Sequence, residues 1–191
     1  AEVLADVNRW WAANADAGRT SVLLAYSFGK AQRVLAGVDA GIGALLVHDS
    51  VAAANDACRM AGMRLPECGR LGDALARGDA AGLRRALVVT PPGTQGADAW
   101  RALGDRREAL ASGWMQLRAA RRRRGAAQGF VLSDHADWPG LLAAIAATGA
   151  SRVIVTHGDE AALVHHLRQQ GLEAGTPAGA HGLHRSTTDP D

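Results

Sequence analysis

The amino-acid sequence predicts an α/β fold with a mainly parallel sheet flanked by helices. Short apolar runs alternate along the chain with helical segments, which is the pattern of strand–helix–strand units. Residues that typically start and end helices also stand where those segments begin and end. With 191 residues, 48% of them hydrophobic, the chain can bury a core as one large domain or two small ones.

The elements of the N-terminal part follow from apolar periodicity. Val3, Val7 and Trp11 recur at helical spacing and predict a helix over residues 2–15. Residues 64–85 are rich in Gly, Ala and Arg, and we expect a loop there with one short helix. The other elements expected in this part are strands at 20–25, 44–47, 86–89 and 108–111 and helices at 31–36, 51–61 and 99–103.

Two histidines follow predicted strands in the C-terminal part. Apolar runs at 130–132 and 153–155 are followed by His135 and His157, respectively. A parallel strand–helix–strand unit places both strand ends at the same edge of a sheet, where ligands bind in open α/β folds. We therefore expect the two imidazoles to be neighbours, either as a functional site or as a pair of structurally satisfied side chains.

The helix between these strands has clear boundary signals. We expect it over residues 141–148, opened by Asp137 and Pro139 and closed by Gly149. Asp137 is a helix-capping residue in this interpretation.

A second candidate site lies after the first predicted strand. Gly29 near a helix start, with a hydroxyl at Ser27 and a cation at Lys30, could hold a phosphate through backbone amides. A tight strand–helix turn explains the same residues equally well. His48 also follows a strand but has no partner at a telling spacing, so we interpret it as structural.

Charge and cysteine content add little about partners. The net charge is +2, yet five arginines fall within residues 118–124, and guanidinium groups suit phosphate. An arginine-rich coding bias is the alternative explanation. Cys58 and Cys68 lack metal-like spacing and there is no long apolar run, so we expect a cytoplasmic protein with free thiols and no membrane partner.

Several motifs resemble those of one enzyme family. Residues 133–137, SDHAD, and 155–158, VTHG, are similar to the last two motifs of the β-CASP branch of the metallo-β-lactamase superfamily. Residues 26–32, YSFGKAQ, resemble its F-x-x-G-R-x-Q helix opening, with Lys30 where arginine is commoner. Residues 111–115, ASGWM, resemble its S-G-M turn. The sequence is most similar to the ligase-associated DNA exonucleases of bacteria, also labelled mRNA 3′-end processing factors.

The resemblance implies roles for individual residues. His157 would be a zinc ligand, and His135 would face the scissile phosphate and help protonate the leaving oxygen. Asp134 and Asp137 would lie next to these groups, although Asp137 could simply cap a helix. The residues implied in backbone or phosphate contact are Ser27, Gly29, Lys30, Ser112 and Gly113.

The resemblance also implies what this chain does not contain. The family's first metal motif, H-x-H-x-D-H, is absent, and the chain begins inside a helical pattern without an initiator Met. We therefore expect a C-terminal piece of a longer enzyme that uses two Zn²⁺ ions, with the other ligands in a missing N-terminal catalytic half. The expected organisation is a β-CASP cap at 1–128, the C-terminal strands and helices of a metallo-β-lactamase αββα sandwich at 129–175, and a flexible tail at 176–191.

The expected function is zinc-dependent hydrolysis of phosphodiester bonds, as a DNA exonuclease in repair, although this piece alone would be inactive. The expected partners are single-stranded DNA or RNA, the missing catalytic half, and a DNA ligase and a helicase of the same pathway. Three alternatives stay open: an RNA 3′-end processing nuclease, a nucleic-acid-binding module without chemistry, and a Rossmann-like binder of a nucleotide or small anion around Gly29 and Lys30.

Overall fold

The computed structural model describes residues 2–94, 97–116 and 128–177, and within them the fold is α/β as predicted. The described chain divides into two compact units, one ending at Asp134 and one beginning at His135. Each unit is described by itself below. The predicted cap ended six residues earlier, at 128. The arginine run and most of the predicted tail lie outside the described residues.

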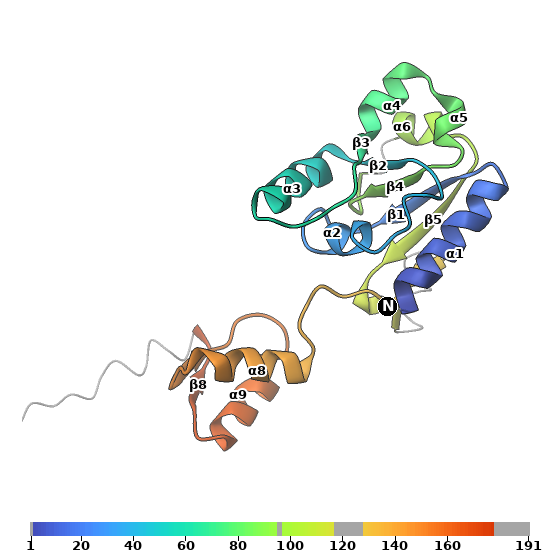
Figure 1. Ribbon diagram of the computed structural model, residues 1–191. Helices are drawn as coiled ribbons and strands as arrows, with labels where there is room; N and C mark the ends of the chain where they lie inside the picture. Colours follow the sequence, from blue (N-terminus) through green and yellow to red (C-terminus); the bar gives the residue numbers. More distant parts are fainter. Residues whose placement is uncertain (1, 95–96, 117–127, 178–191) are drawn as a thin grey trace, which may run out of the picture. The chain divides into compact units, whose positions relative to one another are not determined.

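The first unit is built around a six-stranded sheet in which every pairing is parallel (Figure 1). Its strand order is β3-β2-β4-β1-β5-β6. The strands are β1 (Thr20–Leu24), β2 (Leu45–Val47), β3 (Gly69–Arg70), β4 (Leu87–Thr90), β5 (Arg106–Ala111) and β6 (Gln128–Phe130). The helices are α1 (Glu2–Asp16), α2 (Lys30–Leu35), α3 (Asp49–Met60), α4 (Leu71–Arg77), α5 (Ala80–Leu83), α6 (Ala97–Ala102) and the 3₁₀ helix η1 (Gly113–Gln116).

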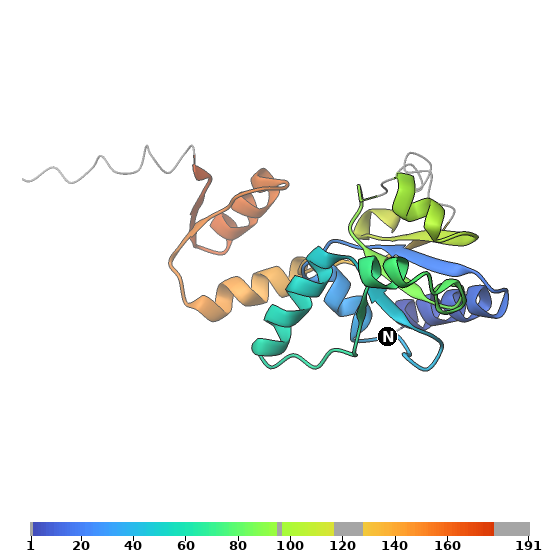
Figure 2. The same cartoon turned by 90° about the horizontal axis from the view of Figure 1, so that it is seen from above.

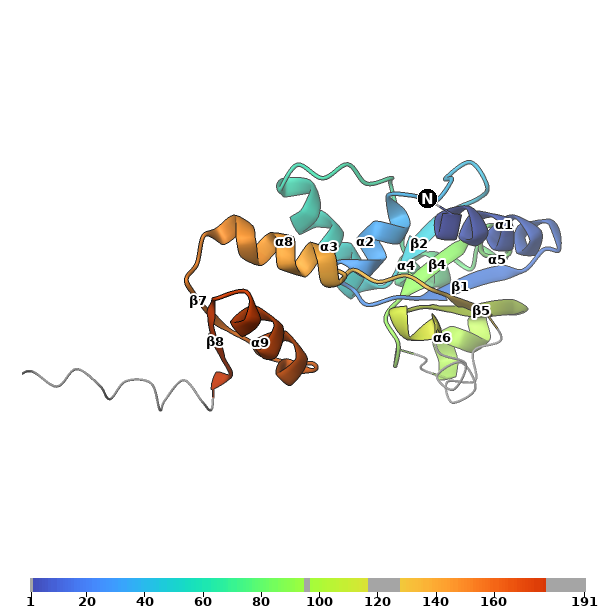
Figure 3. The same cartoon turned by 90° about the horizontal axis from the view of Figure 1, so that it is seen from below.

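Two hydrophobic cores cover the two faces of this sheet. Alternate residues of β1 point to opposite faces, so Leu23 packs with α1, α2 and α3, whereas Val22 packs with α4, α5, α6 and η1. The strand β1 is buried throughout because both faces are covered, as is usual in parallel sheets. Figures 2 and 3 show α1 and α2 on one side of the strands and α6 on the other.

Trp11 is the largest fully buried side chain of the first core. Its indole nitrogen donates a hydrogen bond of 2.9 Å to the carbonyl oxygen of Arg85, which satisfies the polar end of the ring. Trp10, beside it, packs edge-on against Phe130 with 5.7 Å between ring centroids. Both tryptophans of α1 therefore contribute to packing.

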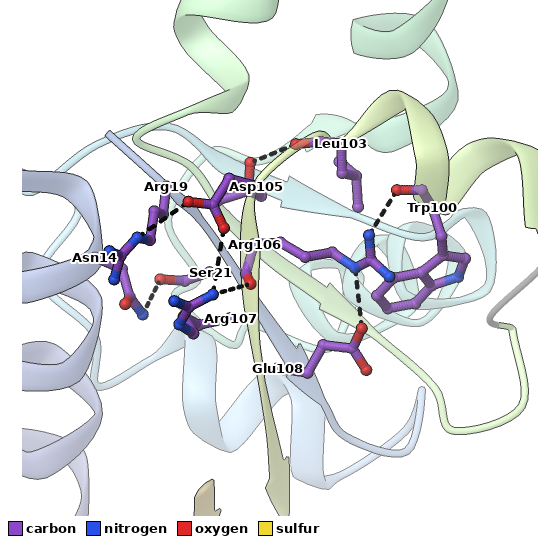
Figure 4. A network of polar contacts seen from close by, with 10 residues as sticks. Asn14, Arg19, Ser21, Trp100, Leu103, Asp105, Arg106, Arg107 and Glu108 are labelled. Atoms are coloured by element: carbon purple, nitrogen blue, oxygen red, sulfur yellow. Dashed lines mark hydrogen bonds and ion pairs between the residues drawn. The ribbon is translucent and has the colours of Figure 1, made fainter. Parts of the chain in front are cut away.

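Ionic contacts hold the amino-terminal end of the sheet (Figure 4). Asp105, which precedes β5, accepts from Arg19 at 3.1 Å and from Arg107 at 3.2 Å. Arg106 pairs with Glu108 at 2.9 Å and lies over the Trp100 ring. These charged groups are committed to one another, so this end of the sheet serves structure.

The second unit contains a two-stranded parallel sheet and two helices. The elements are α8 (Trp138–Thr148), β7 (Arg152–Ile154), α9 (Glu160–Gln169) and β8 (Glu173–Gly175). Asp137 caps α8 by accepting from the Gly140 amide at 2.9 Å, and Gly149 ends the helix in the left-handed conformation. Both boundary predictions for this helix are confirmed.

Two expectations about elements are wrong. Residues 64–85 contain a two-residue strand and two helices, α4 and α5, instead of a loop with one helix. The strands β6 and β7 also do not share a sheet, because β6 pairs with β5 whereas β7 pairs with β8. Among the described strands, His135 and His157 therefore do not follow two strands of one sheet, as was expected. None of the described helices has the length and apolarity needed to cross a membrane.

Candidate functional site

The topology of the sheet singles out the space beyond the carboxyl ends of β1 and β5. These strands are neighbours, with Leu24 paired to Leu110. The connection after β1 runs toward β2 on one side of the sheet, whereas the connection after β5 runs toward β6 on the other. Open α/β sheets bind ligands at such switch points because the diverging connections leave a crevice.

Gly29 forms a rare turn at this point. Its φ of 80° and ψ of −68°, together with a 3.1 Å hydrogen bond from the Lys30 amide to the Phe28 carbonyl oxygen, define a classic γ-turn. A Cβ atom on residue 29 would lie 2.6 Å from Oδ2 of Asp134, so a larger residue would displace this carboxylate and strain the turn at φ 80°. Strained turns of this kind cluster at functional sites.

Lys30 is committed to Asp134. Its Nζ lies 3.1 Å from Oδ1 of Asp134, and the side chains are 5% and 25% exposed, respectively. The same ammonium lies 4.8 Å from the centroid of the Tyr26 ring. Lys30 was predicted to contact phosphate. In the structure its ammonium pairs with Asp134, so each of the two side chains holds the other in position.

The segment before His135 is also held from the other side. A Cβ atom on Gly113 would lie 3.4 Å from Cβ of Ser133, so the turn after β5 packs closely against this segment. The Arg33 guanidinium donates a hydrogen bond to the Ser133 carbonyl oxygen. Three motif segments far apart in sequence, 26–33, 112–115 and 133–134, therefore meet at the switch point.

Ser27 belongs to a small polar network. Its Oγ lies 2.8 Å from Oγ of Ser50, which in turn lies 2.8 Å from Nδ1 of His48. The His48 ring also accepts from the Ser50 amide and so caps α3, which agrees with its structural interpretation. Gln32, almost fully buried, donates to the Ser27 carbonyl oxygen at 3.0 Å and to Oδ1 of Asn55 at 2.8 Å.

Ser112 is buried and serves its own turn. Its amide donates to the Phe130 carbonyl oxygen at 3.0 Å, and its hydroxyl accepts from the Trp114 amide at 3.3 Å. A direct phosphate contact by Ser112 stays a prediction.

His157 carries the one left-handed backbone among non-glycine residues of the described chain, with φ 69°. Its amide donates to Oε1 of Glu160 at 3.0 Å, which ties the turn after β7 to the start of α9. Non-glycine residues adopt this conformation at a cost of about 1–2 kcal/mol. Both His157 and His135 are exposed. Their convergence on one pocket stays a prediction.

The described residues do not by themselves hold zinc. No group of three or more His, Cys, Asp or Glu side chains within them could bind a metal ion. Zinc usually takes three or four protein ligands. The resemblance implies only one ligand here, His157.

Some residues of the site were missed from sequence. Arg33, Asn55 and Ser50 have contacts that join segments 23 to 100 positions apart, and no local spacing signals such contacts. The exposed rings of Phe28 and Trp114 were also missed, although both stand inside the motifs.

Comparisons with known proteins give one informative similarity. The chain matches no protein family model. Over 153 residues, 80% of this chain, it is 29% identical to part of a probable DNA ligase from Opitutus terrae. The matched stretch makes up 14% of that relative's length.

Proposed function

We propose that this chain is the C-terminal part of a zinc-dependent nuclease of the β-CASP branch that hydrolyses phosphodiester bonds in DNA. The observation that carries the proposal is the meeting of the three motif segments at the switch point. Gly29 and Lys30 contact Asp134, and Gly113 packs against Ser133. These residues were selected by a family pattern from segments up to 108 positions apart, and the adjacent strands β1, β5 and β6 bring those segments together at one edge of the sheet.

The relative favours DNA over RNA as the substrate. That protein is named a probable DNA ligase, and the motifs here resemble those of ligase-associated DNA exonucleases. We therefore propose DNA as the substrate, processed in repair alongside ligation and unwinding. An RNA 3′-end processing nuclease is the alternative, which the substrate comparison below separates.

The second unit supports a missing catalytic half. α8 is strongly apolar, yet none of its residues is buried, and Ile154 on β7 is 40% exposed. Parallel sheets are ordinarily covered on both faces and contain more than two strands. Further strands supplied from the catalytic half would bury these apolar groups and complete the sandwich.

The proposal assigns distinct roles to this chain's residues. His135 donates a proton to the leaving oxygen, a general-acid role that requires hydrogen-bond distance to that atom. Lys30, through Asp134, fixes the segment that precedes His135. His157 would contribute one ligand to a metal pair completed by the catalytic half, and such a pair would supply the activation of the attacking water.

The test is cleavage of end-labelled single-stranded DNA and RNA by the complete protein with zinc or manganese. We expect DNA cleavage that His157→Ala abolishes and His135→Ala slows by about 10²–10⁴-fold. His165→Ala, which alters another exposed histidine of the second unit, is the matched control and leaves cleavage unchanged. Full activity of the His157→Ala protein would remove the assignment.

A nucleic-acid-binding module without chemistry is the second candidate, because the described residues contain no metal-binding group. The coding sequence upstream of Ala1 separates the two. An H-x-H-x-D-H segment there decides for the nuclease. The Rossmann-like alternative loses support because Lys30 is already paired with Asp134.

A further inference from the structure

Three aromatic rings of the first unit are exposed, and all three stand at the same edge of the sheet. Tyr26 is 55% exposed, Phe28 is 71% exposed and Trp114 is 62% exposed. Tyr26 and Phe28 follow β1, and Trp114 follows β5, its neighbour in the sheet. The unit buries Trp11, Trp100 and Phe130, so the three exposed rings differ from the other large aromatic side chains of the unit.

The rings flank the switch point described above. Leu24 is paired with Leu110, so continuing the register places residue 26 beside the turn that begins at Ser112. The segments that bear the rings lead toward opposite faces of the sheet, because residues 26–28 precede α2 of the first core, whereas Trp114 lies in η1, whose Met115 belongs to the second core. The Lys30 ammonium, 4.8 Å from the Tyr26 ring centroid, holds that ring in place before any ligand arrives.

The surroundings fit nucleic-acid bases better than a protein surface. The exposed large hydrophobic side chains of this unit are the three rings and two methionines, Met60 and Met63, with no leucine, isoleucine or valine among its described residues. Ser27 stands between Tyr26 and Phe28 in the sequence, and the Lys30 ammonium lies over the Tyr26 ring. Aromatic faces next to polar and basic groups are typical of sites that bind single strands.

We propose that Tyr26, Phe28 and Trp114 form a stacking platform for successive bases of a single-stranded nucleic acid. The proposal rests on the nucleic-acid substrate proposed above and adds the residues that hold the bases. Stacking tolerates any base, because each base offers a π face. The platform therefore binds strands without regard to sequence, and the cleaved phosphate is positioned by other groups.

The test measures binding of a fluorescently labelled oligo-dT strand to the full 191-residue chain, together with an abasic strand of the same length. We expect the abasic strand to bind at least tenfold more weakly. Trp114→Ala and Phe28→Ala each weaken oligo-dT binding about tenfold and leave abasic binding unchanged, because an alanine removes the stacking surface but no charge. Met60→Ala, at a position 90% exposed on α3, is the matched control and changes neither.

Three outcomes overturn the platform. These are equal binding of oligo-dT and abasic strands, retention of full affinity by both ring variants, and weakening of the abasic strand by the same factor. Cleavage by the complete protein is scored separately. If the ring variants still cleave at saturating oligonucleotide concentration, the nuclease proposal stands whatever the binding assay shows. If only the histidine variants lose cleavage, that result bears on the proposed function and not on the platform.

Discussion

The ion pair between Lys30 and Asp134 allows a quantitative prediction for Lys30→Met, which keeps the length of the side chain and removes its charge. Removing one partner of a fully buried pair costs about 3–5 kcal/mol, because the other charge is left without compensation. The Asp134 side chain is 25% exposed, so water recovers part of its solvation. Loss of the contact with the Tyr26 ring adds about 0.5–1 kcal/mol. We expect the free energy of unfolding of the first unit to fall by about 2–3 kcal/mol.

The assay is urea unfolding followed by tryptophan fluorescence, to which the buried Trp11 and Trp100 of the first unit contribute, for Lys30→Met, Asp134→Asn and the double variant. Asp134→Asn is expected to cost at least as much as Lys30→Met, because Lys30 is the more buried partner. The double variant is expected to be more stable than the sum of the two losses implies, with a coupling energy of about 1–3 kcal/mol. Additive losses, with coupling below about 0.5 kcal/mol, would refute the reasoning that the two charges depend on each other.

Three further predictions concern single residues. Gly29→Ala is expected to destabilise the first unit by more than about 2 kcal/mol, because backbone strain at φ 80° adds to a 2.6 Å approach of the new Cβ to Asp134. The control Gly78→Ala, at φ 67° with nothing within 4 Å, is expected to cost only about 1 kcal/mol. Equal losses of the two variants in urea unfolding would contradict this account. His157→Gly relieves the strain of the left-handed backbone and is expected to raise the free energy of unfolding of the second unit, measured by thermal unfolding, by up to about 1 kcal/mol. The same variant is expected to abolish cleavage by the complete protein. A lower free energy of unfolding would show that the imidazole ring is needed for folding. Burial, opposed by Arg59 and assisted by Glu67, raises the pKa of the Cys68 thiol, so the thiol of the unfolded chain loses its proton first and the stability of the fold falls as pH rises above about 8.5. Between pH 8 and pH 10 the urea midpoint of Cys68→Ala is expected to fall less than that of the unaltered protein. Identical pH profiles of the two proteins would contradict the assignment.

Much of the fold could be predicted because the signals were local. The helix at 2–15 and the cap at Asp137 depend on periodicity and on a side chain three residues from its partner. The start of β5 was missed because its first two residues, Arg106 and Arg107, are both charged, and only the later part of the strand is apolar. Strand pairing is a long-range property, and the sequence could not indicate that the strand after residue 128 joins β5 instead of pairing with β7.

The candidate site shows the same division. The structure brings Gly29, Lys30 and Asp134 into contact and packs Gly113 against Ser133, whereas the sequence pattern could not distinguish a phosphate contact from an internal ion pair. The Lys30–Asp134 contact spans 104 positions, and only the folded sheet brings its partners together. The exposure of Trp114 likewise depends on what the rest of the fold leaves uncovered.

The ionic contacts around Asp105 have a practical consequence for handling the protein. They stand at the starts of β1 and β5, and β1 is five residues long, so the motif segments lie roughly 16 Å away at the opposite end of the strands. Arg84 is an exposed residue near the end of the sheet that holds Asp105. A fluorophore or surface linker attached there would allow oligonucleotide binding to be measured without obstructing the motif segments.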